Sequence, residues 1–169
     1  LMRRGISRDK TEELVNTIRE RVPDIALRTT LIAGHPGETE AMFEEMYHFV
    51  EKMRFDRLGI FQYSHEEDTH SFSMPDDIPL EVKQERTDII MELQQGISKE
   101  LNTKKIGQVK KVLFDRSEGG FFIGRTEQDS PEVDNEVLVS TDQYVRLGDF
   151  ANVRIDKVEE FDLFGTVVQ

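Results

Sequence analysis

The sequence of 169 residues contains no cysteine. This absence excludes disulfide bonds and thiolate metal sites within the chain. Apolar runs are also short: none approaches the ~20 residues that a membrane-spanning helix needs, and no secretory leader pattern opens the chain. We therefore expect a cytoplasmic protein that makes no contact with a membrane.

Basic residues are scarce as well. Lysine and arginine total 22 against 34 aspartate and glutamate residues, which gives a net charge of −12. A nucleic-acid-binding protein usually carries a basic stripe, whereas no basic run here is longer than the pairs Lys104-Lys105 and Lys110-Lys111. An acidic surface favours a basic protein partner, although acidity also serves simply to keep a protein in solution.

The first hundred residues alternate between helical and extended patterns. Apolar residues at helical spacing predict helices over 8–22, 39–53 and 79–103, with Ser7 and Thr39 as N-caps of the first two. In the third helix we expect the buried stripe to consist of Val82, Ile89, Leu93, Ile97 and Leu101.

Two extended runs, 26–33 and 57–63, separate these helices. Helix, strand, helix and strand with short links are typical of a parallel sheet. A parallel barrel needs more strands than two, so we expect residues 1–103 to form part of an α/β barrel and to self-associate through the open sheet edge.

Residues 104–169 have a different pattern, with nine basic and 13 acidic side chains and a net charge of −4. Glu118-Gly119-Gly120 predicts a tight hairpin. Five short antiparallel strands in this segment predict an all-β, OB-like barrel. The expected strands cover 108–115, 121–126, 136–140, 152–159 and 163–168.

The segment 34–38, Gly-His-Pro-Gly-Glu, links the first expected strand to the second helix. It is neither a P-loop nor a dinucleotide-binding fingerprint. Strand-to-helix turns bind anionic and nucleotide-like ligands, because free N–H groups and the helix dipole point there. Glu38 could hold a ribose hydroxyl or an amino group, and His35 could line a pocket. The alternative is an ordinary turn with a capping histidine.

Arg28, Thr30 and Ile32 share one face of the first strand, which points inward in a parallel barrel. A buried Arg28 needs a carboxylate, which a cofactor, Asp56 or a neighbouring strand could supply.

His65 and His70 superficially resemble a zinc-protease pair, but the spacing is one residue too long for both to bind one metal from a helix face. We expect no metal site in this chain. The sequence shows no Ser-His-Asp arrangement, and we expect no catalytic residue in this chain.

The acidic loop over 124–134 follows a strand of the expected barrel. Such a charged, protruding loop could dock a basic partner, or it could simply be a solvated loop.

Several segments form a recognisable series along the chain: 28–38, Phe61-x-Tyr63-Ser64, Met91-x-Leu93-Gln94-Gln95-x-Ile97-Ser98, Gly124-Arg125-Thr126-Glu127 and Ser130-Pro131-Glu132-Val133-Asp134. In this order they resemble the motifs of one enzyme family, the radical S-adenosylmethionine methylthiotransferases. The last of them, in a loop of the expected barrel, is similar to the branch of the family that modifies an aspartate of a small-subunit ribosomal protein.

The resemblance implies the last strands of a radical S-adenosylmethionine barrel over 1–103, followed by a TRAM domain over 104–169. It implies a parent enzyme that uses S-adenosylmethionine and two 4Fe–4S clusters to insert a methylthio group at the aspartate β-carbon. The cluster cysteines of the family are absent here. We therefore expect a carboxy-terminal fragment that holds no cofactor and is inactive by itself.

The resemblance also implies roles for particular residues. Thr30 and Asp68-Thr69 depart from the family pattern, which has glycine at the first position and Gly-Thr at the second. Cofactor contacts are expected from Arg28, Thr30, Ile32, Gly34, Glu38 and Tyr63, and docking of the basic protein substrate from Arg125, Glu127, Asp129, Glu132 and Asp134.

Two alternatives stay open. A tRNA methylthiotransferase would bind nucleic acid and predicts a basic barrel face. A stand-alone TRAM module would bind a partner without catalysis, and it predicts a native gene that begins near Met2.

Overall fold

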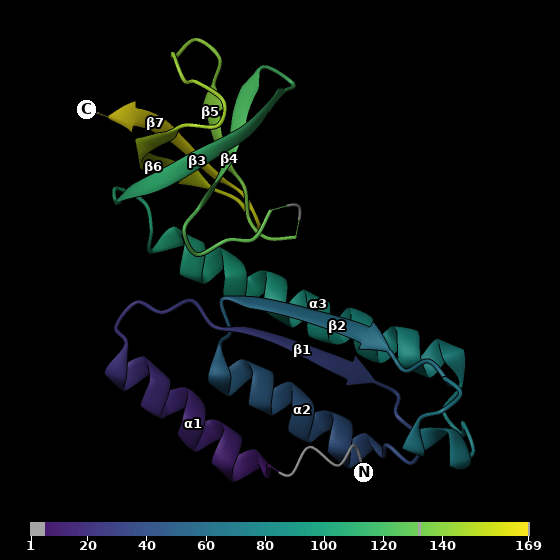
Figure 1. Cartoon of the computed structure of the whole chain (residues 1–169). Helices are drawn as coiled ribbons and strands as arrows, with labels where there is room; N and C mark the ends of the chain where they lie inside the picture. Colours follow the sequence, from purple (N-terminus) through teal and green to yellow (C-terminus); the bar gives the residue numbers. More distant parts are fainter. Residues whose placement is uncertain (1–5, 132, 169) are drawn as a thin grey trace. The chain divides into compact units, whose positions relative to one another are not determined.

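The computed structural model describes residues 6–131 and 133–168. The chain divides into two compact units, Leu1–Gln94 and Gln95–Gln169. The helix α3, Leu80–Thr103, contributes to both units (Figure 1). The domain boundary expected after residue 103 lies at the end of this helix, whereas the two compact units divide after Gln94. Within the described residues, no helix combines the length and the apolar character needed to cross a membrane.

The first unit is a two-stranded parallel sheet with helices. The strands pair in register from Arg28 with Arg57 to Ala33 with Gln62, and Ser7 and Thr39 cap the first two helices as predicted. Its elements in chain order are α1 (Arg8–Arg21), β1 (Arg28–Ala33), α2 (Glu40–Met53), β2 (Arg57–Gln62), the short helix η1 (His70–Ser73) and the first part of α3.

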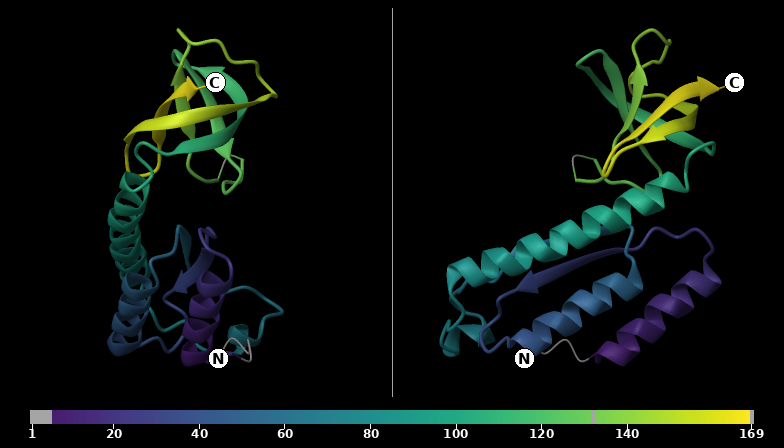
Figure 2. Two further views of the ribbon diagram at one scale, coloured as in Figure 1. Left: turned by 90° about the vertical axis from the view of Figure 1, so that its left-hand side faces the viewer. Right: turned by 180° about the vertical axis from the view of Figure 1, so that it is seen from behind.

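One face of this sheet packs against α1 and α2, which lie along the strands (Figure 2). Val15, Met53 and Phe55 form the buried centre, with Leu27 and Leu58 packed against it. The alternating residues project from the opposite face, where Phe61 is 64% exposed. Among the described residues no third strand joins the pair, so self-association through the sheet edge stays a prediction.

The buried face of α3 differs from the expected stripe. Ile97 is buried as predicted, whereas Val82, Ile89, Leu93 and Leu101 are only partly buried. The stripe prediction was wrong because polar side chains fill most of the buried positions, and several bind partners inside the chain. The residues of α3 that are buried are Lys83, Arg86, Ile90, Gln94, Ile97, Ser98 and Asn102.

The second unit is a closed barrel whose strands follow the order β3-β4-β5-β7-β6 (strands labelled in Figure 1). Gly119 and Gly120 form the predicted hairpin between β3 and β4, both with positive φ. The strands are β3 (Val109–Glu118), β4 (Phe121–Thr126), β5 (Val137–Ser140), β6 (Phe150–Val158) and β7 (Leu163–Val168).

The expectation that all strands run antiparallel was wrong at one pair, because β5 and β7 are parallel. The reason is geometric. In a closed ring with an odd number of strands, directions cannot alternate all the way round, so at least one neighbouring pair must be parallel. The core inside the ring is apolar and consists of Val112, Phe114, Val137, Val139, Val145, Val153, Ile155 and Leu163.

Candidate functional site

A pocket of about 530 Å³ opens at the carboxyl ends of β1 and β2. This is the edge at which open parallel sheets bind ligands. Apolar and aromatic side chains from both strands form one wall, and the loop that carries η1 forms the other. The lining residues are Thr30, Ile32, His35, Phe61, Gln62, Tyr63, Ser64, Glu66, Thr69, His70 and Ser71.

The pocket brings together three of the six residues that the sequence assigned to a cofactor: Thr30, Ile32 and Tyr63. Arg28 is exposed at the start of β1, beside Arg57 of β2. Asp56, which was considered as its carboxylate partner, accepts the backbone N–H of Leu27 at 2.9 Å.

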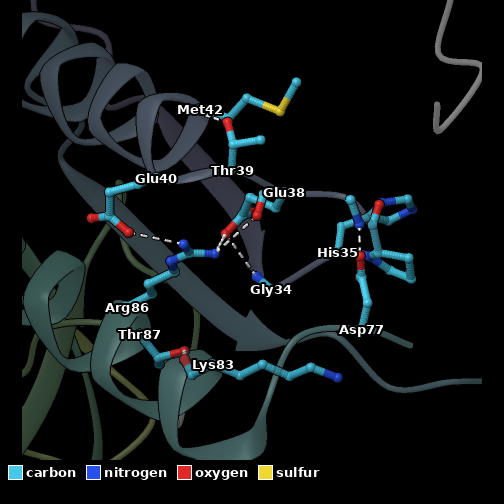
Figure 3. Close-up of polar contacts among 12 residues, drawn as sticks. Gly34, His35, Glu38, Thr39, Glu40, Met42, Asp77, Lys83, Arg86 and Thr87 are labelled. Carbon is cyan, nitrogen blue, oxygen red and sulfur yellow. Dashed lines mark hydrogen bonds and ion pairs between the residues drawn. The ribbon is translucent and has the colours of Figure 1, made fainter. Parts of the chain in front are cut away.

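The side-chain carboxylate of Glu38 stabilises the turn from Gly34 to Glu38. Gly34 has φ of +76°, a conformation that favours glycine. The Oε1 atom of Glu38 accepts the backbone N–H of Gly34 at 3.1 Å and lies 2.8 Å from Nη1 of Arg86 (Figure 3). Glu38 is not among the residues that line the pocket, and its side chain is 12% exposed, so its contact with a ribose hydroxyl or an amino group stays a prediction.

His35 is buried and does two things that the sequence left open. Its ring lines the pocket, with its edge toward Tyr63 at 5.1 Å between centroids. Its Nδ1 donates to the carbonyl of Pro36, and its Nε2 lies 2.8 Å from the hydroxyl of Ser71 in η1. The ring therefore ties the two walls of the pocket together.

The loop that follows β2 contains further aromatic contacts. The hydroxyl of Tyr63 lies 3.3 Å from Nδ1 of His65, whose ring packs on Phe72. No group of three metal-ligating side chains occurs among the described residues.

Sequence reasoning missed two residues beside the turn, Lys83 and Arg86 of α3. The ammonium of Lys83 lies 2.7 Å from both carboxylate oxygens of Asp76, in the loop after η1. The neighbouring Asp77 accepts the backbone N–H of Gly37 at 3.0 Å. A signal was present: residues 83, 86, 90, 94 and 97 follow the helical period as closely as the apolar stripe does.

In the barrel, the residues assigned to docking differ in exposure. Glu127 is exposed, and Arg125 is paired with Asp115 at 3.1 Å. Asp134 accepts the backbone N–H of Ser130 at 2.7 Å. The fifth residue, Glu132, lies outside the described residues.

The structure corrects the expectation for Asp129, which was assigned to an exposed docking loop. This residue is only 7% exposed, and its carboxylate accepts the hydroxyl of Thr126 at 2.5 Å. The carboxylate of an aspartate can accept hydrogen bonds from nearby groups of its own loop in this way. Asp129 therefore shapes the loop from inside instead of facing a partner.

A second pocket of about 300 Å³ lies beside this loop. In this pocket the guanidinium of Arg116 forms a bidentate ion pair with the carboxylate of Glu136, with N–O distances of 2.7 and 3.0 Å. The hydrogen bonds that Arg116 donates to Glu136 and then to Glu118 raise its pKa above the ordinary value. The lining residues are Asp115, Arg116, Gly124, Arg125, Ser130, Pro131, Asp134, Asn135 and Glu136.

Comparison with known proteins agrees with this architecture. Residues 106–168 match the family model of the TRAM domain. A solved structure of Mycoplasma genitalium RNase R in its apo form is 11% identical, has a TM-score of 0.31 and covers 60% of this chain and 20% of its own. That likeness is too low to support an argument.

Three curated relatives share one description, ribosomal protein uS12 methylthiotransferase RimO. The protein of Cytophaga hutchinsonii is 68% identical over 170 residues and covers 100% of this chain. Those of Christiangramia forsetii and Parabacteroides distasonis are 54% and 49% identical, over 97% and 99% of this chain. The chain spans 37–39% of the length of these relatives. The resemblance to the ribosomal-protein branch of the methylthiotransferases is thereby confirmed.

Proposed function

Because the chain resembles the ribosomal protein uS12 methylthiotransferases over its whole length, we propose that it works as the carboxy-terminal part of such an enzyme. The observation that carries the proposal is the 68% identity that extends through both units. In this proposal the α/β unit supplies one wall of the cofactor pocket, and the TRAM barrel binds the protein substrate.

The pocket at the end of β1 and β2 fits the adenosyl part of S-adenosylmethionine. Ile32, Phe61 and Tyr63 offer apolar and aromatic faces for a base. Hydroxyl and carboxylate groups for a ribose are available on Thr30 and Glu66. When bound, S-adenosylmethionine would supply the radical chemistry, and the role of this chain is to hold the nucleoside and keep water from it.

Iron–sulfur clusters do not fit this chain. Proteins hold such clusters mainly through cysteine thiolates, and the sequence contains none. The two clusters that the family resemblance implies would therefore be held by residues outside these 169.

The charge of the barrel supports a protein substrate over tRNA. Phosphate contacts need lysine and arginine, whereas residues 104–169 carry a net charge of −4. Glu127 and the second pocket present carboxylates on the surface of the barrel. A basic ribosomal protein is complementary to this surface, and such a substrate places the parent enzyme in the cytoplasm.

The proposal is tested by grafting this chain into a relative. The corresponding segment of the Cytophaga hutchinsonii enzyme is replaced by the 169 residues, and the purified chimera is incubated with uS12, S-adenosylmethionine and a reductant. Mass spectrometry then measures methylthiolation of the aspartate. Activity within about tenfold of the parent, which is 1.4 kcal/mol in the barrier, is expected; a correctly folded, cluster-loaded but inactive chimera would contradict the proposal.

A further inference from the structure

Two buried cations lie on the face of α3 that packs against the turn of the candidate site. Lys83 is 4% exposed and Arg86 is 6% exposed. They are three residues apart, so they lie on the same side of the helix. Lysine and arginine are almost never so deeply buried unless they are paired. Their partners therefore indicate what these two residues do.

Arg86 joins three elements through its guanidinium. Its Nη1 lies 2.8 Å from Glu38 in the turn, and its Nη2 lies 3.0 Å from Glu40 in the first turn of α2 (Figure 3). Its flat face lies over the ring of Phe43, 5.3 Å from the ring centroid. A guanidinium suits this task because its donors point in fixed directions within one plane, whereas the donors of an ammonium group rotate.

The contact continues from Glu38 into the backbone. The oxygen of Glu38 that binds Arg86 is the same Oε1 that accepts the N–H of Gly34. Arg86 thus fixes the direction of one particular peptide group at the end of β1. Two residues close to Gly34 in the sequence line the pocket: Ile32 before it and His35 directly after it.

Lys83 holds the same glycine from another direction. Its side-chain stem fills the space beside Gly34 so closely that a Cβ atom there would come within 2.3 Å of Cγ of Lys83. Its ammonium continues to Asp76, which lies beyond η1. The turn and the loop that face each other across the pocket are therefore both anchored to α3.

We propose that Arg86 is a positioning residue for the pocket at the carboxyl end of β1. Acting through Glu38, it fixes the amide of Gly34 and so sets the places of Ile32 and His35 in the pocket wall. Glu38 serves as the counter-ion in this arrangement instead of contacting the ligand. The identity of the ligand rests on the proposed function, whereas the control of the turn does not.

Glu40 offers a matched control for Glu38. Both carboxylates bind the same guanidinium, but Glu40 is 72% exposed in its side chain and has no bond to the turn, whereas the side chain of Glu38 is 12% exposed. Glu40→Gln removes the exposed ion pair of Arg86. Glu38→Gln weakens the buried ion pair of Arg86 and the hydrogen bond that connects it to the amide of Gly34. A role in general stability would be affected by both changes, and a positioning role chiefly by the second.

The experiment measures the backbone amide of Gly34 in the ¹⁵N-labelled chain. We expect Glu38→Gln and Arg86→Lys to move its resonance and to speed its hydrogen exchange about tenfold, the effect of 1.4 kcal/mol on an opening equilibrium. Glu40→Gln should leave both quantities near those of the wild type. Circular dichroism confirms that each variant is folded. Unchanged exchange of Gly34 in folded Glu38→Gln and Arg86→Lys proteins would overturn the proposal.

A second measurement follows the binding of S-adenosylmethionine to the chimera described under the proposed function, because the 169 residues supply only part of the cofactor site. The dissociation constant should rise about tenfold in Glu38→Gln, which is again 1.4 kcal/mol, and stay unchanged in Glu40→Gln. Equal weakening in both variants would overturn the positioning role. If the unmodified chimera binds no S-adenosylmethionine, the assigned ligand fails, and the exchange of Gly34 still decides whether Arg86 controls the turn.

Discussion

The two units of this chain bury their interiors in different ways. The barrel closes on itself and fills its centre with eight apolar side chains. In the part of the chain that the structure describes, the sheet of the α/β unit has two strands, and the part of α3 that this unit buries includes Lys83, Arg86 and Gln94. The centre of the barrel is apolar, whereas the buried face of α3 in the α/β unit includes two cations that are held by ion pairs with the turn and with the loop after η1. The comparison explains why the α/β unit, with an uncovered sheet face, is the one suited to hold a small ligand.

The largest expected effect comes from the core of the barrel. Phe114 is fully buried there, so Phe114→Ala should lower the free energy of unfolding of the barrel by about 3–5 kcal/mol through lost burial and a cavity. Denaturant titration followed by NMR separates the two units. Barrel resonances should be lost early while the amide of Gly34 keeps its position. A loss below about 1 kcal/mol would mean that the barrel does not depend on its apolar core.

A smaller effect is expected at the turn of the α/β unit. Gly34→Ala places a Cβ at positive φ and against Lys83, which together should cost about 1–3 kcal/mol. Gly37→Ala is the matched control, because Gly37 has a φ of +79° but open space around the added atom. The difference between the two melting temperatures isolates the contact with Lys83. Equal losses would show that this contact has no energetic weight.

The smallest effects concern two aspartates of the barrel whose pKa values move in opposite directions. Burial raises the pKa of Asp162. Its contribution to stability is then present below the ordinary pKa of aspartate and is lost as the pH rises through the raised value. The hydroxyl of Thr166 and then Arg154 lower the pKa of Asp156. Its contribution is present above the ordinary pKa and is lost as the pH falls through the lowered value.

Two substitutions check these signs. Near neutral pH, Asp162→Asn should stabilise the barrel and Asp156→Asn should destabilise it, each by less than about 1 kcal/mol because both groups are partly solvated. The measurement is the denaturant midpoint of each variant between about pH 3 and pH 7, the range around and above the ordinary pKa of aspartate. Shifts of the same sign at neutral pH would contradict the two assignments.

Much of the fold could be predicted from the sequence because local signals agreed with the tertiary structure. The N-caps Ser7 and Thr39 and the hairpin at Gly119-Gly120 all lie where their residue types predict. The parallel pair β5 and β7 was missed because closure of a ring is a global property, which the pattern of one strand does not contain.

The candidate site was predicted less completely, for a physical reason. Thr30, Ile32 and Tyr63 meet at the pocket because strand alternation fixes the side on which they lie. Lys83 and Arg86 were missed because a charged residue on a helix is ordinarily solvated, and only long-range ion pairs bury these two. Asp129 was misjudged for the converse reason: its partner Thr126 is local, and nothing in the charge pattern separates an inward carboxylate from an outward one.

The central claim, an acidic barrel that binds a basic protein, is tested most directly by a binding titration. The chain is titrated with uS12 and, in parallel, with bulk tRNA across a series of salt concentrations, with Glu127→Lys as the variant that reverses one exposed charge. The account predicts salt-sensitive binding of uS12 that Glu127→Lys weakens, and no comparable binding of tRNA. Binding of tRNA alone would contradict it and would favour a tRNA-modifying parent.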